Sequence, residues 1–223
     1  MAAHPTTEGQ VAFEAPNAGK PCHTWYKIVG ILKPGITPLI TLHGGPGAGH
    51  EYLTSLVDIY EKYGIPVVFY DQIGCGRSTH LPEKKGDTSF WTFDLYKQEL
   101  ANLVNHLALQ SGFHLFGQSW GGMFGGEFAC SQPPGLRKLI ISSGPASIPL
   151  LVKGYEPLIA GLPPDVRQTI NDCIARGDYE SDEFEKASAV FYGRHVCRLD
   201  PPPEEVTYAF KHLKEDPTAY LTL

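Results

Sequence analysis

The residues best suited to do chemistry lie in one short stretch, Gly117-Gln118-Ser119-Trp120-Gly121. An apolar run typical of a buried strand precedes it, and a glycine-rich sequence typical of a helix start follows. A sharp turn between the two would strain the backbone of Ser119, and the small residues Gly117 and Gly121 would let the two arms pack closely. Such a turn exposes the hydroxyl and directs helix N–H groups at developing negative charge. The stretch therefore predicts that Ser119 is a nucleophile.

A second glycine-rich stretch directly follows another apolar run, and it consists of His43, Gly44, Gly45, Pro46 and Gly47. Backbone N–H groups of such a loop can complete an oxyanion hole beside a nucleophile. We assign the two donors to the N–H groups of Gly45 and Trp120. His43 precedes the nucleophile, whereas the base of such a site follows it in sequence. We therefore interpret His43 as a structural loop residue.

A third polar stretch, Asp71-Gln-Ile-Gly-Cys-Gly-Arg-Ser78, follows the next apolar run. By itself it is a turn with two glycines and a potential pair between Asp71 and Arg77. Nothing near Cys75 in sequence marks a thiolate-forming site, so we do not expect this cysteine to be a nucleophile. The stretch is interpreted as structural.

Strand-like and helix-like segments alternate through the first two thirds of the chain, which predicts a mostly parallel sheet with crossover helices. Strands are predicted at residues 11–15, 23–31, 38–42, 66–70, 113–116 and 136–142. Helices are predicted at residues 93–109, 165–176, 182–195 and 203–214. No strand-like run follows residue 150, so we divide the chain into an α/β core, residues 1–146, and a helical cap, residues 147–223.

Composition limits the possible partners. The chain has 223 residues and a net charge of −6, and it has no run of basic residues, which argues against a nucleic-acid partner. No apolar run is long enough to span a membrane, and the start does not resemble a signal peptide. The five cysteines are odd in number and scattered, which favours reduced thiols in the cytoplasm. No spacing typical of metal ligands occurs, so we predict no metal.

The three stretches together, HGGPG, DQIGCGRS and GQSWGG, resemble the proline iminopeptidase family, including its fungal amino-acid amidase-like members. The later segment FYGRHVCR, followed by three prolines, is similar to the cap of that family. The resemblance implies an α/β-hydrolase fold with an inserted helical cap. It also implies release of an N-terminal residue, often proline, from short peptides or amides through an acyl-enzyme on Ser119, without a cofactor.

A serine nucleophile needs a base and a carboxylate that orients it, and in this fold both follow the serine. In the family they follow the cap, and we expect this chain to stop inside the cap at Leu223. The histidines after Ser119, His195 and His212, fall in predicted helices. Five aspartates after Ser119 lack a strand-end context as well; they are Asp172, Asp178, Asp182, Asp200 and Asp216. We assign no acid or base, and we expect the chain alone to be a poor enzyme, either truncated or completed by a second polypeptide.

Two alternatives stay open at the level of sequence. The first is an amidase or esterase of the same fold, because the residues that would recognise a free amine are not visible. The second is a non-catalytic binding protein derived from a truncated hydrolase, which would bind a ligand without covalent labelling of its serine.

Overall fold

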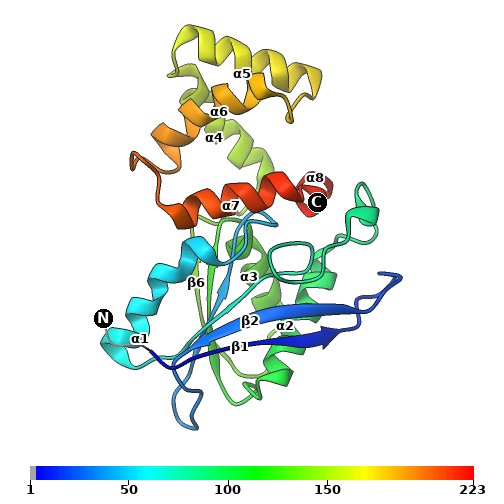
Figure 1. The fold of residues 1–223 in the computed structure, drawn as a ribbon, viewed down its shortest axis with the longest axis vertical. Helices are drawn as coiled ribbons and strands as arrows, with labels where there is room; N and C mark the ends of the chain where they lie inside the picture. Colours follow the sequence, from blue (N-terminus) through cyan, green and yellow to red (C-terminus); the bar gives the residue numbers. More distant parts are fainter. Residues whose placement is uncertain (1–3) are drawn as a thin grey trace. The chain divides into compact units, whose positions relative to one another are not determined.

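A computed structural model describes residues 4–223 (Figure 1). The chain divides into two compact units. The core unit runs to Gly144 and also includes Glu205–Leu223, and the helical unit is Pro145–Glu204. None of the helices in the described residues is long and apolar enough to cross a membrane.

The core unit is built on a six-stranded sheet with the order β1-β2-β4-β3-β5-β6. The strands are β1 (Thr6–Phe13), β2 (Cys22–Val29), β3 (Leu39–Leu42), β4 (Val67–Tyr70), β5 (Phe113–Gln118) and β6 (Leu136–Ser142). β2 pairs antiparallel with β1 and β4, and the remaining pairs are parallel. This arrangement confirms the predicted α/β-hydrolase fold class. β3 and β4 are buried along their whole length, as expected for central parallel strands.

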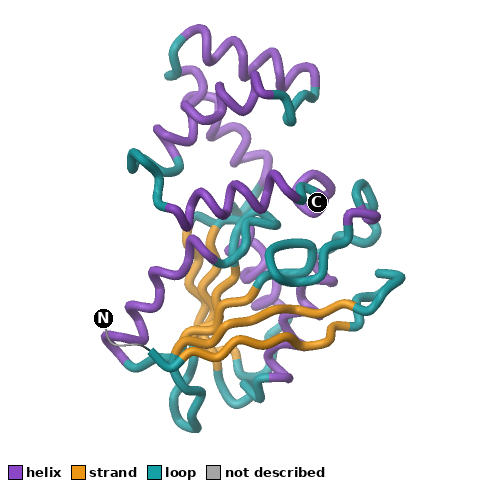
Figure 2. The backbone as a smooth tube through the Cα atoms, viewed as in Figure 1, coloured by secondary structure: helices purple, strands orange, loops and turns teal. Residues whose placement is uncertain are grey.

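Helices cover both faces of this sheet (Figure 2). On one face α2 (Phe93–His106) and α3 (Trp120–Cys130) bury Leu100, Leu103 and Phe124 in the main apolar cluster. On the other face η1 (Glu51–Leu56) and α1 (Val57–Tyr63) pack on a second apolar cluster that contains Val67 and Phe69. A short 3-10 turn, η2 (Pro82–Lys84), lies in the connection between β4 and α2.

The helical unit contains α4 (Ile148–Ala160), α5 (Pro164–Arg176) and α6 (Asp182–His195). Its small core consists of Leu162, Ile170 and Ala187, and the partly buried Phe184 and Phe191 pack against it. The helices predicted at residues 165–176 and 182–195 are present, and Phe184 and Phe191 of α6 help to hold this unit together.

The last two helices, α7 (Glu204–Glu215) and α8 (Thr218–Thr222), group with the core from Glu205 onward. His212 bonds to Glu51, and the carboxylate of Asp216 bonds to His80. Ala219 is only 1 % exposed within the main apolar cluster. The segment predicted as cap, residues 147–223, is thus divided: its first part forms the helical unit, and its last part packs on the core.

Candidate active site

Ser119 lies at a strained turn between β5 and α3. Its backbone angles are φ 54° and ψ −120°, which a residue other than glycine rarely adopts. Its N–H donates to the carbonyl of Ser142 on β6 at 2.9 Å. A Cβ added to Gly117 would overlap the backbone of Gly121, and one added to Gly121 would overlap the backbone of Leu42. The close approach of strand and helix therefore requires the two glycines that the sequence places around Ser119.

The glycine-rich loop after β3 lies beside this turn. A Cβ added to Gly44 would lie 3.2 Å from the Cβ of Ser119, so the backbone of the loop comes close to the serine. Gly45 has a φ of 111°, and the peptide bond between Gly45 and Pro46 is cis. Within residues 4–223 the N–H groups of Gly45 and Trp120 donate to no protein acceptor. Both groups that the sequence assigned to the oxyanion hole are therefore available to a ligand.

Tyr52 of η1 joins the loop to the serine turn. Its hydroxyl accepts the N–H of Gly44 at 2.6 Å and donates to Oε1 of Gln118 at 2.7 Å. Burial raises the pKa of Tyr52, so the hydroxyl keeps the proton that it donates. Tyr52 has no sequence signature, because its partner Gln118 lies 66 positions away.

Gln72 makes a second connection between the glycine-rich loop and the serine turn. Its Nε2 donates to the carbonyl oxygen of His43 at 3.0 Å, and its Oε1 accepts the indole N–H of Trp120 at 2.9 Å. The N–H of Gln72 donates to Nε2 of His43 at 2.9 Å, so the proton of the neutral ring is on Nδ1, which donates to the carbonyl of Gly44. Burial lowers the pKa of His43. These contacts agree with the interpretation of His43 as structural.

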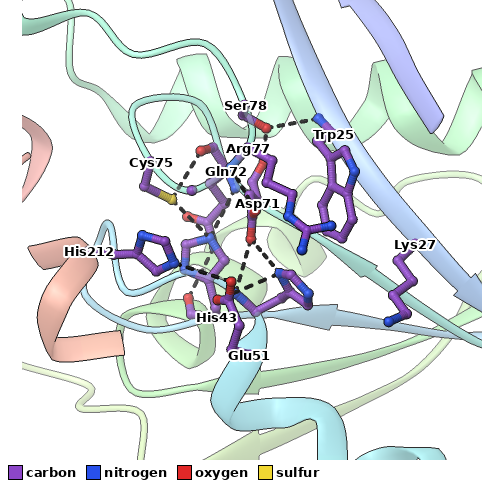
Figure 3. A network of polar contacts seen from close by, with 12 residues as sticks. Trp25, Lys27, His43, Glu51, Asp71, Gln72, Cys75, Arg77, Ser78 and His212 are labelled. Carbon is purple, nitrogen blue, oxygen red and sulfur yellow. Dashed lines mark hydrogen bonds and ion pairs between the residues drawn. The ribbon is translucent and has the colours of Figure 1, made fainter. Parts of the chain in front are cut away.

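Asp71 is the centre of a buried polar network (Figure 3). It accepts the N–H of His50 at 3.0 Å, Nδ1–H of His50 at 2.8 Å and the N–H of Arg77 at 2.9 Å. Burial by itself raises the pKa of Asp71, but the bonds from His50 outweigh it and the pKa is lowered. The pair predicted between Asp71 and Arg77 thus uses the backbone of Arg77, whose guanidinium instead bonds to Glu8 and lies 4.6 Å from the ring centre of Trp25.

His50, Glu51 and Asp71 place one potential ligand atom each within 4.8 Å of one another, the one such group in the described part of the chain. The carboxylate of Asp71 already accepts three N–H groups, and Nδ1 of His50 is one of these donors. The arrangement is therefore that of a hydrogen-bonded network that fixes the loop after β4.

In the part of the chain that the structure describes, no acid and base are brought to Ser119. Within residues 4–223 the hydroxyl of Ser119 makes no hydrogen bond to a histidine. His212 on α7 is bonded at 3.2 Å to Glu51, a bond that raises its pKa, and His195 on α6 packs 4.9 Å from the ring of Phe191. Neither histidine that follows Ser119 is therefore assigned as the base.

Comparison with known proteins places this geometry in a family. A family model described as the alpha/beta hydrolase fold matches residues 37–216. This chain belongs to that family. A proline iminopeptidase of Saccharolobus solfataricus is 39% identical over 78% of the chain and 55% of its own length. One from Lactobacillus delbrueckii subsp. bulgaricus is 38% identical over 89% of the chain and 66% of its own length.

Solved structures agree with the relatives. VinJ superimposes with a TM-score of 0.88 at 42% identity, and a proline iminopeptidase of Mycobacterium smegmatis does so with 0.79 at 35% identity. The two matches include 96% and 95% of this chain, respectively, but only 69% of each of the two solved chains. The predicted resemblance to proline iminopeptidases is confirmed. The chain spans between about half and two thirds of the length of the curated relatives it matches.

Proposed function

We propose that this α/β-hydrolase is a serine hydrolase of the proline iminopeptidase type, with Ser119 as its nucleophile. The observation that carries the proposal is the backbone of Ser119, held at φ 54° between β5 and α3 beside the loop of Gly44 and Gly45. A strained, partly exposed serine next to free N–H groups is suited to acyl transfer. The names of the relatives support a substrate with a free N-terminal residue, such as a short peptide or a small amide.

In the proposed mechanism the hydroxyl oxygen of Ser119 attacks the substrate carbonyl carbon and passes its proton to a general base. The N–H groups of Gly45 and Trp120 donate to the oxyanion that forms, and loss of one such donor typically costs about 10²–10³ in rate. The intermediate collapses with the proton transferred to the leaving amine, which leaves an acyl-enzyme on Ser119. Water then releases the acyl group. The base and the acid that orients it come from outside the described contacts of Ser119.

The proposal is tested by intact-mass analysis after treatment with a fluorophosphonate, with Ser119→Ala as the control. We expect one adduct on the wild type when the general base of Ser119 is present, and no adduct on the variant. The same preparation is then assayed on paired substrates whose terminal amine is free or blocked. Turnover of the blocked substrates alone would favour an amidase or esterase, and a folded protein that is never labelled would contradict the proposal.

The cytoplasmic location stays a prediction. All five cysteines are free, and three of them, Cys22, Cys75 and Cys173, are buried. Burial raises the pKa of Cys75 well above its usual range, which suits an unreactive thiol and agrees with its exclusion as a nucleophile.

A further inference from the structure

Two histidine–carboxylate pairs join the end of α7 to the loops of the candidate site. His212 on α7 bonds through Nε2 to Oε1 of Glu51, the first residue of η1, at 3.2 Å (Figure 3). His80, in the connection after β4, bonds through Nδ1 to Oδ2 of Asp216, which directly follows α7. One histidine thus belongs to α7 and the other to the loop below it, and both pairs lie within the core unit.

The same helix packs on the backbone of the glycine-rich loop. A Cβ added to Gly47 would lie 3.4 Å from Cδ2 of Leu213, and one added to Gly49 would lie 2.9 Å from Cδ2 of His212. The two glycines lie two and four positions after Gly45, whose N–H is assigned to the oxyanion hole. The position of α7 is therefore coupled to the backbone that presents this donor.

The surroundings of His80 require a proton on both nitrogens of its ring. Nδ1 faces the carboxylate of Asp216, and Nε2 lies 3.0 Å from the carbonyl oxygen of Gly76. An ionised carboxylate and a carbonyl can only accept, and only the imidazolium form has two N–H groups to donate. The neutral ring would keep one of these bonds and lose the other. The side chain of His80 is 39% exposed, so its proton can exchange with solvent.

His212 depends on its proton through charge. Its bond to Glu51 raises its pKa above the ordinary value of 6.5 against the effect of burial, and the nearby carboxylates of Asp71 and Glu215 act in the same direction as Glu51. Burial by itself raises the pKa of Glu51, but the bond from His212 and the nearby His50 outweigh it, and the pKa is lowered. The stability contributed by His212 is therefore complete below pH 6.5 and is lost as the pH rises through its folded pKa.

We propose that His80 and His212 form a pH-sensitive clasp that holds α7 on the glycine-rich loop. In weakly acidic solution both rings are positively charged and face ionised carboxylates, so the clasp is closed. As the pH rises above neutrality, His80 loses one bond, His212 loses its charge, and α7 detaches more often. Charge-assisted hydrogen bonds are roughly twice as strong as neutral ones, and histidine is the side chain whose charge changes in this range.

The clasp makes the order of the glycine-rich loop depend on pH, and its effect on catalysis rests on the proposed function of Ser119. When α7 detaches, Gly47 and Gly49 lose the side chains that pack on them, and the loop that carries Gly45 gains freedom. Oxyanion-hole donors are effective because they are fixed in place before charge develops. The donors of the proposed hydrolase are therefore best ordered in weakly acidic solution.

Amide hydrogen exchange of the full chain tests the clasp. It is expressed as protection factors, which correct for the intrinsic exchange rate at each pH. We expect the protection of residues 205–216 to fall at least about tenfold from pH 5.5 to pH 8.5, because two charge-assisted bonds weaken, and that of residues 44–51 to fall with it. β3 and β4 report unfolding of the whole core, including the effect of any other titrating group, and their protection is expected to fall less.

The double variant His80→Gln, His212→Gln keeps an N–H donor toward each carboxylate but cannot be protonated. We expect residues 205–216 of this variant to be less protected than in the wild type at pH 5.5, and to change with pH no more than β3 and β4 do. His195→Gln, the same change on α6 of the helical unit, is the matched control and is expected to behave as the wild type does.

A second measurement needs no variant and applies even if the double variant does not fold. The ring ¹⁵N shifts of His80 and His212 are followed in the wild type through the same pH range. We expect both rings to lose their proton over the range in which residues 205–216 lose protection.

Three outcomes would overturn the clasp: no fall in protection in the wild type, an equal fall in the wild type and the double variant, or rings that titrate without a change in α7. Labelling of Ser119 by a fluorophosphonate is followed separately, because the exchange measurement needs no active serine. A working clasp beside a serine that is never labelled would remove only the proposed function. Labelling of Ser119 together with pH-independent protection of α7 would remove only the clasp.

Discussion

At the scale of single residues, the sequence indicated the backbone of the candidate site better than the side-chain contacts that hold it together. The serine turn and the glycine-rich loop were predictable, because close backbone approach demands glycine at fixed spacings. Tyr52 and Gln72 were not, because each becomes significant only when elements distant in sequence meet. A hydrogen-bond partner of this kind is a property of the folded chain and not of the local pattern.

The variant Tyr52→Phe tests one of these connections. It removes the hydroxyl that joins the N–H of Gly44 to Oε1 of Gln118, and it leaves both groups without that partner. Leaving partly buried polar groups unsatisfied costs roughly 1–3 kcal/mol, so we expect the free energy of unfolding to fall by about that amount. Urea denaturation measures it, with Tyr63→Phe as control because Tyr63 is 74% exposed. Equal stability of both variants would show that the hydroxyl contributes nothing.

Glu99 on α2 gives a pH-dependent prediction. It is fully buried, accepts the hydroxyl of Thr24 at 2.6 Å and the N–H of Ile73 at 2.8 Å, and burial raises its pKa to about 8. The unfolded chain loses this proton near pH 4.5, so between pH 4.5 and 8 the folded state binds more protons than the unfolded state. The stability contributed by this group is therefore complete below pH 4.5 and is lost as the pH rises to 8.

The variant Glu99→Gln keeps an acceptor for Thr24 and Ile73 but cannot ionise. We expect its free energy of unfolding, relative to that of the wild type, to improve steadily from pH 5 to pH 8, because only in the wild type must the folded state hold a proton that the unfolded state releases. Urea denaturation at a series of pH values measures the difference, and the exposed Glu14→Gln serves as control. Parallel profiles for wild type and Glu99→Gln would contradict the raised pKa.

At the scale of elements, the sequence predicted best the parallel strands, whose residues are mostly apolar. β3, β4 and β5 coincide with short apolar runs, since central parallel strands need apolar residues throughout. β1 was placed at residues 11–15 but runs from Thr6 to Phe13, because an exposed edge strand has a polar start that resembles a loop. β6 was predicted correctly, yet its exposed isoleucines could be recognised only once its neighbours were known.

At the scale of the whole molecule, sequence predicted two parts but not the attachment of the last helices. A continuous series of helices after residue 147 suggested one cap. Tertiary contacts instead place α7 and α8 on the core, because His212, Asp216 and Ala219 find partners there. Helical periodicity shows which face of a helix is apolar and not which body it covers.

The variant Ala219→Glu tests this attachment. Ala219 is 1% exposed in the main apolar cluster, so a carboxylate there must be desolvated or displace α8, and we expect a loss of at least about 2 kcal/mol in stability. All three tryptophans, Trp25, Trp91 and Trp120, belong to the core unit, so their fluorescence during urea denaturation reports on that unit alone. Tyr220→Glu is the matched control, since Tyr220 is 50% exposed on the same helix. If α8 belonged to the helical unit, Ala219→Glu would leave the tryptophan transition where the control has it.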